Sequence, residues 1–299
     1  MQLVANYSCS TGEGPLWHPD EELLYWVDIP VGCLYSYDPK SNSSRKILQS
    51  GQIGGFTIQT DGTLLLFMEK GAVRLLRDGK LTTIVDEIKG EEHSRFNDVI
   101  AAPDGSVFCG TMPSDKKTGS LYKLGLDKKI SLVIEDAGIS NGLGFSNDLR
   151  HIYHTNSINR TISKFEFDAD NSRIGNGEII VTTPNNAGVP DGMTVDADDC
   201  IWSARWDGWA LYRYDADGEE IDRINFEVKK VSCPTFGGTN YEDIYVTTAG
   251  GEDPDNNGTF AGGLFKLKSF AKGKEAVSYT HLRAHETEAD LVCRLLLEK

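Results

Sequence analysis

Residues 13–28 read EGPLWHPDEELLYWVD, and this stretch decides the fold. Two short apolar runs flank a polar turn at Asp20, which is the pattern of a β-hairpin. The pattern returns five more times, with turns at Asp61, Asp104, Asp148, Asp198 and Glu242. Successive turns lie 41 to 50 residues apart, a period that is typical of propellers and solenoids.

Each repeat contains four short runs, as in GPLWH, LLYWVD, GCLYSYD and SRKILQ between residues 14 and 49. Four short strands with turn residues between them are typical of a propeller blade. The sixth repeat has no fourth run after GGLFKLK (262–268), whereas QLVAN at residues 2–6 resembles the fourth run of an earlier repeat. We therefore predict an all-β, six-bladed β-propeller over residues 1–276, in which residues 2–6 supply the outer strand of the last blade.

Residues 277–299, VSYTHLRAHETEADLVCRLLLEK, break the glycine-punctuated pattern. Residues 277–287 and 290–299 back-translate into the two constant blocks of a common sequencing adaptor. Residues 288–289 would then be encoded by the variable index between the blocks. We expect this tail to be non-native read-through, with the natural chain continuing differently after Ala276.

The overall composition limits the classes of partner. The formal net charge is −15, which argues against nucleic acid and anionic membranes as partners. No stretch is long and apolar enough to cross a bilayer, and the N-terminus does not resemble a signal peptide. The six cysteines are scattered without a CxxC pair, which favours reduced thiols and a cytoplasmic location. Nothing in the sequence indicates an oligomeric state.

Polar residues recur at one offset in the repeats. The positions seven residues before the six turn residues are Glu13, Gly54, Asn97, Asn141, Asp191 and Thr235. In a closed ring these positions would face one another at one mouth of the central channel. Carboxylate and amide oxygens suit a hard divalent ion such as Ca²⁺, Mg²⁺ or Mn²⁺, and they leave Zn²⁺ and Fe²⁺ open. Asp and Asn are also common turn residues, but four carboxylate or amide side chains at one offset favour a shared site.

The motifs EGP (13–15), RFND (95–98), SNGLGFS (140–146), PDGM (190–193) and FGG (236–238) resemble the gluconolactonase/regucalcin (SMP-30) family. The resemblance covers essentially residues 1–276. It implies a six-bladed propeller that binds one divalent metal and hydrolyses sugar lactones. It also implies that Glu13, Asn141 and Asp191 are metal ligands, that Asp191 is the proton acceptor, and that Arg95 and Asn97 bind substrate.

The function we predict is metal-dependent hydrolysis of aldonolactones. We take gluconolactone as the default substrate, and xylono-, arabinono- and galactonolactone are close alternatives. Asn156, at the end of a second strand, is expected to contact the substrate at the same mouth. Animal regucalcins have a substrate-contacting Glu shortly after a GTM motif. In this chain GTM (110–112) is followed by Pro113 and Ser114, which leaves the choice of lactone open. The alternatives are a calcium-binding regulatory propeller without hydrolase activity and an organophosphate or aryl-ester hydrolase.

One further motif suggests a different chemistry. Residues 138–142 match G-x-S-x-G, with Ser140 in the place of a nucleophile. A nucleophile elbow requires a strand followed by a turn and a helix, whereas this segment opens a propeller strand. We therefore do not expect Ser140 to be a nucleophile, and we interpret His154 as a packed or hydrogen-bonded strand residue.

Overall fold

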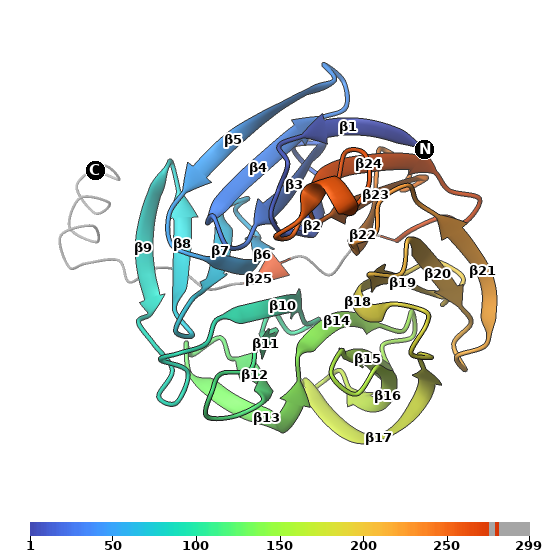
Figure 1. Ribbon diagram of the computed structural model, residues 1–299. Helices are drawn as coiled ribbons and strands as arrows, with labels where there is room; N and C mark the ends of the chain where they lie inside the picture. The colour runs from blue at the N-terminus through green and yellow to red at the C-terminus, as the bar shows by residue number, and fades with distance from the viewer. Residues whose placement is uncertain (275–278, 281–299) are drawn as a thin grey trace.

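The structure is a computed structural model that describes residues 1–274 and 279–280. Six sheets of four antiparallel strands surround a central axis, and one of them gains a short fifth strand (Figure 1). In the first five blades the four strands of each repeat follow one another in chain order from the axis outward, and the added fifth strand lies on the inner side of blade 2. The predicted all-β, six-bladed β-propeller is confirmed.

The strands of each blade are as follows. Blade 1 contains β2 (Gly12–His18), β3 (Leu23–Asp28), β4 (Cys33–Asp38) and β5 (Ser43–Gln49). Blade 2 contains β6 (Ile53–Gln59), β7 (Leu64–Met68), β8 (Val73–Arg77) and β9 (Lys80–Val85). Blade 3 contains β10 (Phe96–Ala101), β11 (Val107–Thr111), β12 (Gly119–Leu124) and β13 (Ile130–Gly138). Blade 4 contains β14 (Ser140–Phe145), β15 (His151–Asn156), β16 (Thr161–Asp168) and β17 (Arg173–Thr182). Blade 5 contains β18 (Val189–Val195), β19 (Ile201–Trp206), β20 (Ala210–Tyr214) and β21 (Glu220–Asn225).

Blade 6 joins the two ends of the ring. It contains β22 (Val231–Gly237), β23 (Asp243–Thr248), β24 (Gly263–Lys268) and, as its outer strand, β1 (Gln2–Asn6). Strand β1 pairs antiparallel with β24, with Gln2 opposite Lys266 and Asn6 opposite Gly263 (Figure 1). The predicted closure by residues 2–6 is therefore confirmed. Closure pairs the outer edge of β24, which would otherwise be free to add a strand from another chain.

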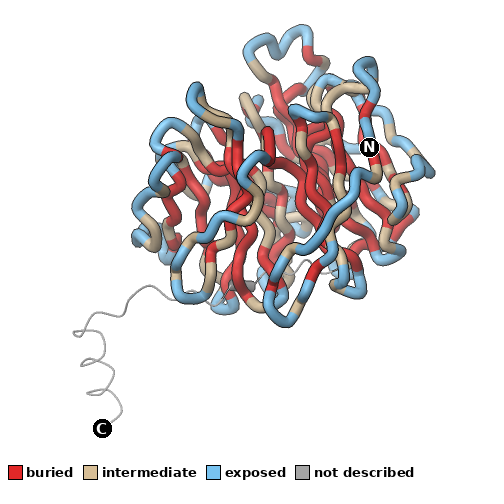
Figure 2. Tube along the Cα trace, turned by 90° about the horizontal axis from the view of Figure 1, so that it is seen from below, coloured by how far each residue is buried: buried red, intermediate tan, exposed pale blue. Residues whose placement is uncertain are grey.

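Burial changes from the axis to the rim of each blade. Strand β7, with the sequence LLLFM, is buried at every position, because other blades or strands cover both of its faces. The outer strand β9, with the sequence KLTTIV, is largely exposed. Figure 2 shows the buried segments in the interior and the exposed segments on the outer strands and turns. Continuous apolar runs thus mark inner strands, as expected for strands that are buried on both faces.

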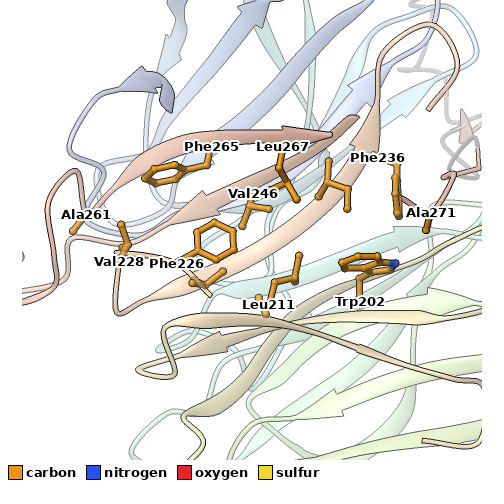
Figure 3. Packing of buried hydrophobic residues seen from close by; sticks show 13 residues of the cluster. Trp202, Leu211, Phe226, Val228, Phe236, Val246, Ala261, Phe265, Leu267 and Ala271 are labelled. Atoms are coloured by element: carbon orange, nitrogen blue, oxygen red, sulfur yellow. The ribbon is translucent and has the colours of Figure 1, made fainter. Parts of the chain in front are cut away.

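Apolar side chains between neighbouring blades form the core. Between blades 5 and 6, Trp202 and Leu211 face Phe236 and Val246 (Figure 3). The rings of Trp202 and Phe236 meet edge to face, with their centroids 6.1 Å apart. Close packing of this kind holds the blades in fixed relative positions. Side chains at the start of different inner strands therefore have defined positions relative to one another.

Part of the predicted tail lies within the described residues. Tyr279–Thr280 form β25, which pairs in parallel with Ile58 and Gln59 of β6. The rest of residues 277–299 lies outside the described residues. Within the described part of the chain, no helix has the length and hydropathy needed to cross a membrane. The cysteines of this part, at 9, 33, 109, 200 and 233, are free and buried.

Candidate metal centre at one mouth of the channel

The innermost strand of every blade has an irregular register near its start. Such β-bulges bend the strand locally and change where its side chains point. The predicted site residues lie at four of these bulges: Glu13 in β2, Asn97 in β10, Asn141 in β14 and Asp191 in β18. The bulges thus place polar side chains at the same end of four inner strands, those of blades 1, 3, 4 and 5.

These residues line one cavity of about 380 Å³. Five of the six predicted site residues are in its wall, namely Glu13, Arg95, Asn97, Asn141 and Asp191. They come from blades 1, 3, 4 and 5, so the cavity exists only because the ring closes. The remaining lining residues are Thr11, Met112, Ile139, Ser157, Val189, Pro190 and Trp206.

Asn156, the sixth predicted residue, is not in the cavity wall. Its Oδ1 accepts a hydrogen bond from the backbone N–H of Asn159 at 3.0 Å, within the turn that follows β15. Asp28, which ends β3 as Asn156 ends β15, accepts hydrogen bonds from the backbone N–H groups of Ser10 and Thr11. Both side chains therefore hold loops beside the cavity.

The repeat offset was wrong in blade 6. Thr235 pairs regularly with Tyr245, and the bulge of this blade lies between Val231 and Cys233. Ser232 is therefore the residue that is equivalent to Glu13, and its hydroxyl donates to Gly12 O at 2.6 Å. The error arose because Glu242 lies beside the next strand rather than within the turn, which displaces the count by three residues.

Gly54 occupies the equivalent bulge in blade 2, where the backbone of the neighbouring strand β10 leaves no room for a side chain. A Cβ atom at this position would lie 2.0 Å from Phe96 O and 2.4 Å from Phe96 C. Only glycine allows β6 to approach β10 this closely. This position therefore contributes close packing between blades 2 and 3 rather than a polar group.

The two asparagines have different hydrogen-bond partners. The Oδ1 of Asn97 accepts from Arg95 Nη1 at 2.8 Å, and its Nδ2 donates to Ser140 O at 3.1 Å. The Nδ2 of Asn141 donates to Asp191 Oδ1 and, at 3.1 Å, to Ser157 Oγ. Its Oδ1 has a long contact of 3.3 Å with the N–H of Gly142. The amide oxygen of Asn97 therefore already accepts a hydrogen bond from the guanidinium of Arg95, whereas the amide oxygen of Asn141 has only one long contact.

The acidic side chains at the mouth repel one another. Burial, followed by the charges of Asp191 and Asp98, raises the pKa of Glu13 well above its usual range. Burial and the charge of Asp98 raise the pKa of Asp191 in the same direction, against the hydrogen bond from Asn141. Burial raises the pKa of Asp98 itself to about 7, although Arg95 opposes the shift. Three carboxylates thus share the neighbourhood of one guanidinium.

Asp98 was missed as a site residue, although it belongs to the RFND motif. It follows Asn97 in the bulge of β10 and lines a second cavity of about 110 Å³, together with Gly14 and Cys233. Burial and the charges of Glu13, Asp98 and Asp191 raise the pKa of Cys233 well above its usual range. The thiol at this level of the channel is therefore neutral and is no candidate for a thiolate ligand.

The donor set fits a hard divalent cation. Buried carboxylates that repel one another need a positive charge, and Arg95 alone supplies only one. Among the described residues, no three His, Cys, Asp or Glu side chains converge to hold a metal ion. A cation here would instead rest on two carboxylates, Glu13 and Asp191, completed by the amide oxygen of Asn141. Oxygen-only sets of this kind are typical of Ca²⁺ and Mg²⁺.

Ser140 has none of the features of a nucleophile. It is fully buried in β14, and its Oγ is 2.9 Å from His154 Nε2. Burial lowers the pKa of His154 to about 4, so the imidazole is neutral at physiological pH. Ser140 lies in a strand rather than at an elbow, and its carbonyl orients Asn97. The interpretation of His154 as a hydrogen-bonded strand residue is confirmed.

This buried histidine predicts an acid sensitivity of the fold. Because the folded pKa of His154 lies below its unfolded value of 6.5, the unfolded state binds more protons between pH 6.5 and 4, and stability falls as pH falls. The loss expected from this one group is about 3 kcal/mol. Denaturant unfolding of His154→Asn should show a shallower decline over this pH range than the parent protein. Equal pH slopes would contradict the prediction, and His93→Asn, at an exposed position, is the control.

Comparisons with known proteins identify several relatives of this chain. Residues 11–250 match the family model described as SMP-30/Gluconolactonase/LRE-like region. The chain is 43% identical to pentonolactonase XacC of Haloferax volcanii over 281 residues, which cover 91% of this chain and 95% of that protein. It is 30% identical to a 6-deoxy-6-sulfogluconolactonase of Pseudomonas putida, over 83% of this chain and 87% of that protein. The crystal structure of regucalcin from Agrobacterium tumefaciens, a calcium-binding protein, superposes with a TM-score of 0.86 at 25% identity, covering 93% of this chain and 96% of that one.

Proposed function

This chain belongs to the SMP-30/gluconolactonase/LRE-like family, and from that premise we propose that the cavity at the channel mouth is the active site of a sugar lactonase. The chain is an enzyme that opens aldonolactones to aldonic acids, as the names of its relatives indicate for those proteins. The observation that carries the proposal is the presence of Glu13, Asn141 and Asp191, from three blades, in the wall of one cavity.

The regucalcin of Agrobacterium tumefaciens, which superposes on this chain, is a calcium-binding protein. In this chain Glu13, Asn141 and Asp191, which line one cavity, would hold one divalent ion, with Ca²⁺, Zn²⁺, Mg²⁺, Mn²⁺ and Fe²⁺ as candidates. The hydrogen bonds support this choice of asparagine. The oxygen of Asn141 has only a long contact with Gly142, whereas that of Asn97 accepts from Arg95. A divalent ion bound to this set would supply Lewis-acid chemistry, polarising the lactone carbonyl and lowering the pKa of a bound water molecule.

Arg95 and Asn97 bind the substrate. One guanidinium nitrogen of Arg95 is held by Phe96 O and Asn97 Oδ1, which fixes the direction of the remaining donors. The second N–H of the Asn97 amide is likewise available for a sugar hydroxyl. Asn156 supports this arrangement from the turn after β15, where it holds the N–H of Asn159. Trp206, Val189 and Ile139 form an apolar wall for the C–H faces of the lactone ring.

Asp191 acts on the attacking water. Its Oδ1 is engaged by Asn141, which leaves Oδ2 to take a proton as the water oxygen bonds to the carbonyl carbon. The ring C–O bond then breaks, and the proton held by Asp191 passes to the leaving ring oxygen. Each turnover consumes one water and restores the carboxylate. Arg95 donates hydrogen bonds that keep the lactone in place during these steps.

A substrate panel tests the proposal. The full chain is assayed with glucono-, galactono-, xylono- and arabinonolactone, with phenyl acetate, and with an organophosphate, each after metal exchange. We expect turnover of at least one aldonolactone with a kcat/KM about 100-fold above that for phenyl acetate, since Arg95 and Asn97 recognise hydroxyl groups that the aryl ester lacks. Metal binding without turnover of any lactone would support a calcium-binding regulatory protein. Preference for the aryl ester or organophosphate would support the other hydrolase class.

A further inference from the structure

Ser157 connects two of the proposed metal ligands. It follows β15 directly, is buried, and lies in the wall of the active-site cavity. Its backbone N–H donates to Ile139 O at 3.2 Å, which fixes its place beside β14. Its hydroxyl lies 2.7 Å from Pro190 O and 3.1 Å from Asn141 Nδ2.

The chemistry of these groups leaves one arrangement of protons. A hydroxyl has one hydrogen to donate, and a carbonyl oxygen can only accept. The Ser157 hydrogen is therefore directed to Pro190 O, and the serine offers only lone pairs to Asn141. Asn141 must meet it with the N–H side of its amide. The second N–H of the same amide points at Asp191 Oδ1.

We infer that Ser157 is a positioning residue for the metal centre. With both N–H groups of Asn141 engaged, the amide oxygen is turned to the side on which a cation is held. The bond to Pro190 also fixes the backbone next to Asp191, so that one hydroxyl ties a ligand of blade 4 to a ligand of blade 5. This inference rests on the proposed function, because it assigns Ser157 a role toward the ion held by Glu13, Asn141 and Asp191.

Metal affinity is the decisive measurement, because it does not depend on turnover. Ser157→Ala removes the acceptor that orients Asn141, and we expect the Kd for Mn²⁺ or Ca²⁺, measured by titration calorimetry on metal-stripped protein, to rise about tenfold. Lactonase activity should fall at limiting metal and recover at saturating metal. Ser157→Thr retains the hydroxyl and should restore most of the affinity. Ser120→Ala is the matched control, because Ser120 is also buried, in blade 3, and its hydroxyl donates to Glu135 O at 2.8 Å.

A double variant tests whether Ser157 acts through Asn141. If it does, adding Ser157→Ala to Asn141→Ala should change the Kd by less than about twofold, although each single change weakens binding. The inference is overturned if Ser157→Ala binds the ion as tightly as the parent protein, or if the two changes are fully additive. If the parent protein itself takes up no divalent ion, the metal centre of the proposed function fails first, and that result is distinguishable from a failure of Ser157.

Discussion

Asp191→Asn is expected to lower kcat for lactone hydrolysis by about 10³-fold, within the range found for removal of a general base. The amide cannot take the proton of the attacking water, and it also weakens a proposed metal ligand. The protein should remain folded, because the change removes one of three carboxylates that repel one another at the channel mouth. Steady-state kinetics at saturating metal, together with thermal unfolding, measure the two effects separately.

Asp196→Asn is the matched control, because Asp196 directly follows the strand that contains Asp191. Asp196 is fully buried and accepts hydrogen bonds from Trp202 Nε1 at 2.9 Å and from Arg213. Its replacement should lower the thermal midpoint and leave kcat near the parent value, because it lies outside the cavity wall. Near-parent hydrolysis by Asp191→Asn would refute the proposed role of Asp191.

Removal of divalent ions should abolish activity and destabilise the fold at the same time. After treatment with EDTA, the charges of Glu13, Asp98 and Asp191 repel one another with Arg95 as the nearby cation, and we expect activity to fall by more than about 100-fold. Addition of a divalent ion should restore activity and raise the thermal midpoint, because a ligand that binds only the folded state stabilises it by mass action.

Glu13→Gln links this effect to the proposed site. The variant lacks one of the two charged ligands, so both the midpoint shift and the reactivation should need at least about tenfold more metal than the parent protein does. If Glu13→Gln is reactivated at the same metal concentration as the parent protein, Glu13 is not a ligand and the ion binds at another site. Full activity of the parent protein in EDTA would exclude a metal-dependent mechanism.

Much of the fold could be predicted because its pattern is local. An inner strand such as β7 is an uninterrupted apolar run, and turn residues such as Asp61 and Asp104 separate such runs at a regular period. Ring closure was also predictable, since the sixth repeat lacks a run that residues 2–6 supply. In blade 6 the prediction of the individual site residue was wrong. There Glu242 sits beside β23 rather than in the turn, so that counting from it selected Thr235 instead of Ser232.

The site was predictable only where residue type and repeat position coincided. Glu13, Asn141 and Asp191 carry oxygen ligands at the equivalent bulges, so the repeat alone brings them together. Asp98 was missed because the repeat offset selects one residue of each bulge, whereas the bulge of β10 holds two. Ser157 was missed because its role depends on the position of Pro190 O, which belongs to another blade. Contacts between blades depend on the geometry of the closed ring, so the repeat pattern of the sequence does not predict them.

The pairing of β1 with β24 also has a consequence for biosynthesis. Strand β1 leaves the ribosome first, but it cannot pair until β24 has been synthesised more than 250 residues later. Until then blade 1 has no neighbour on one side, and Glu13 cannot face Asp191 across the axis. Native contacts between such distant segments form slowly, and the incomplete ring exposes strand edges meanwhile. Catalytic competence should therefore appear only at the end of translation, as one late event rather than blade by blade.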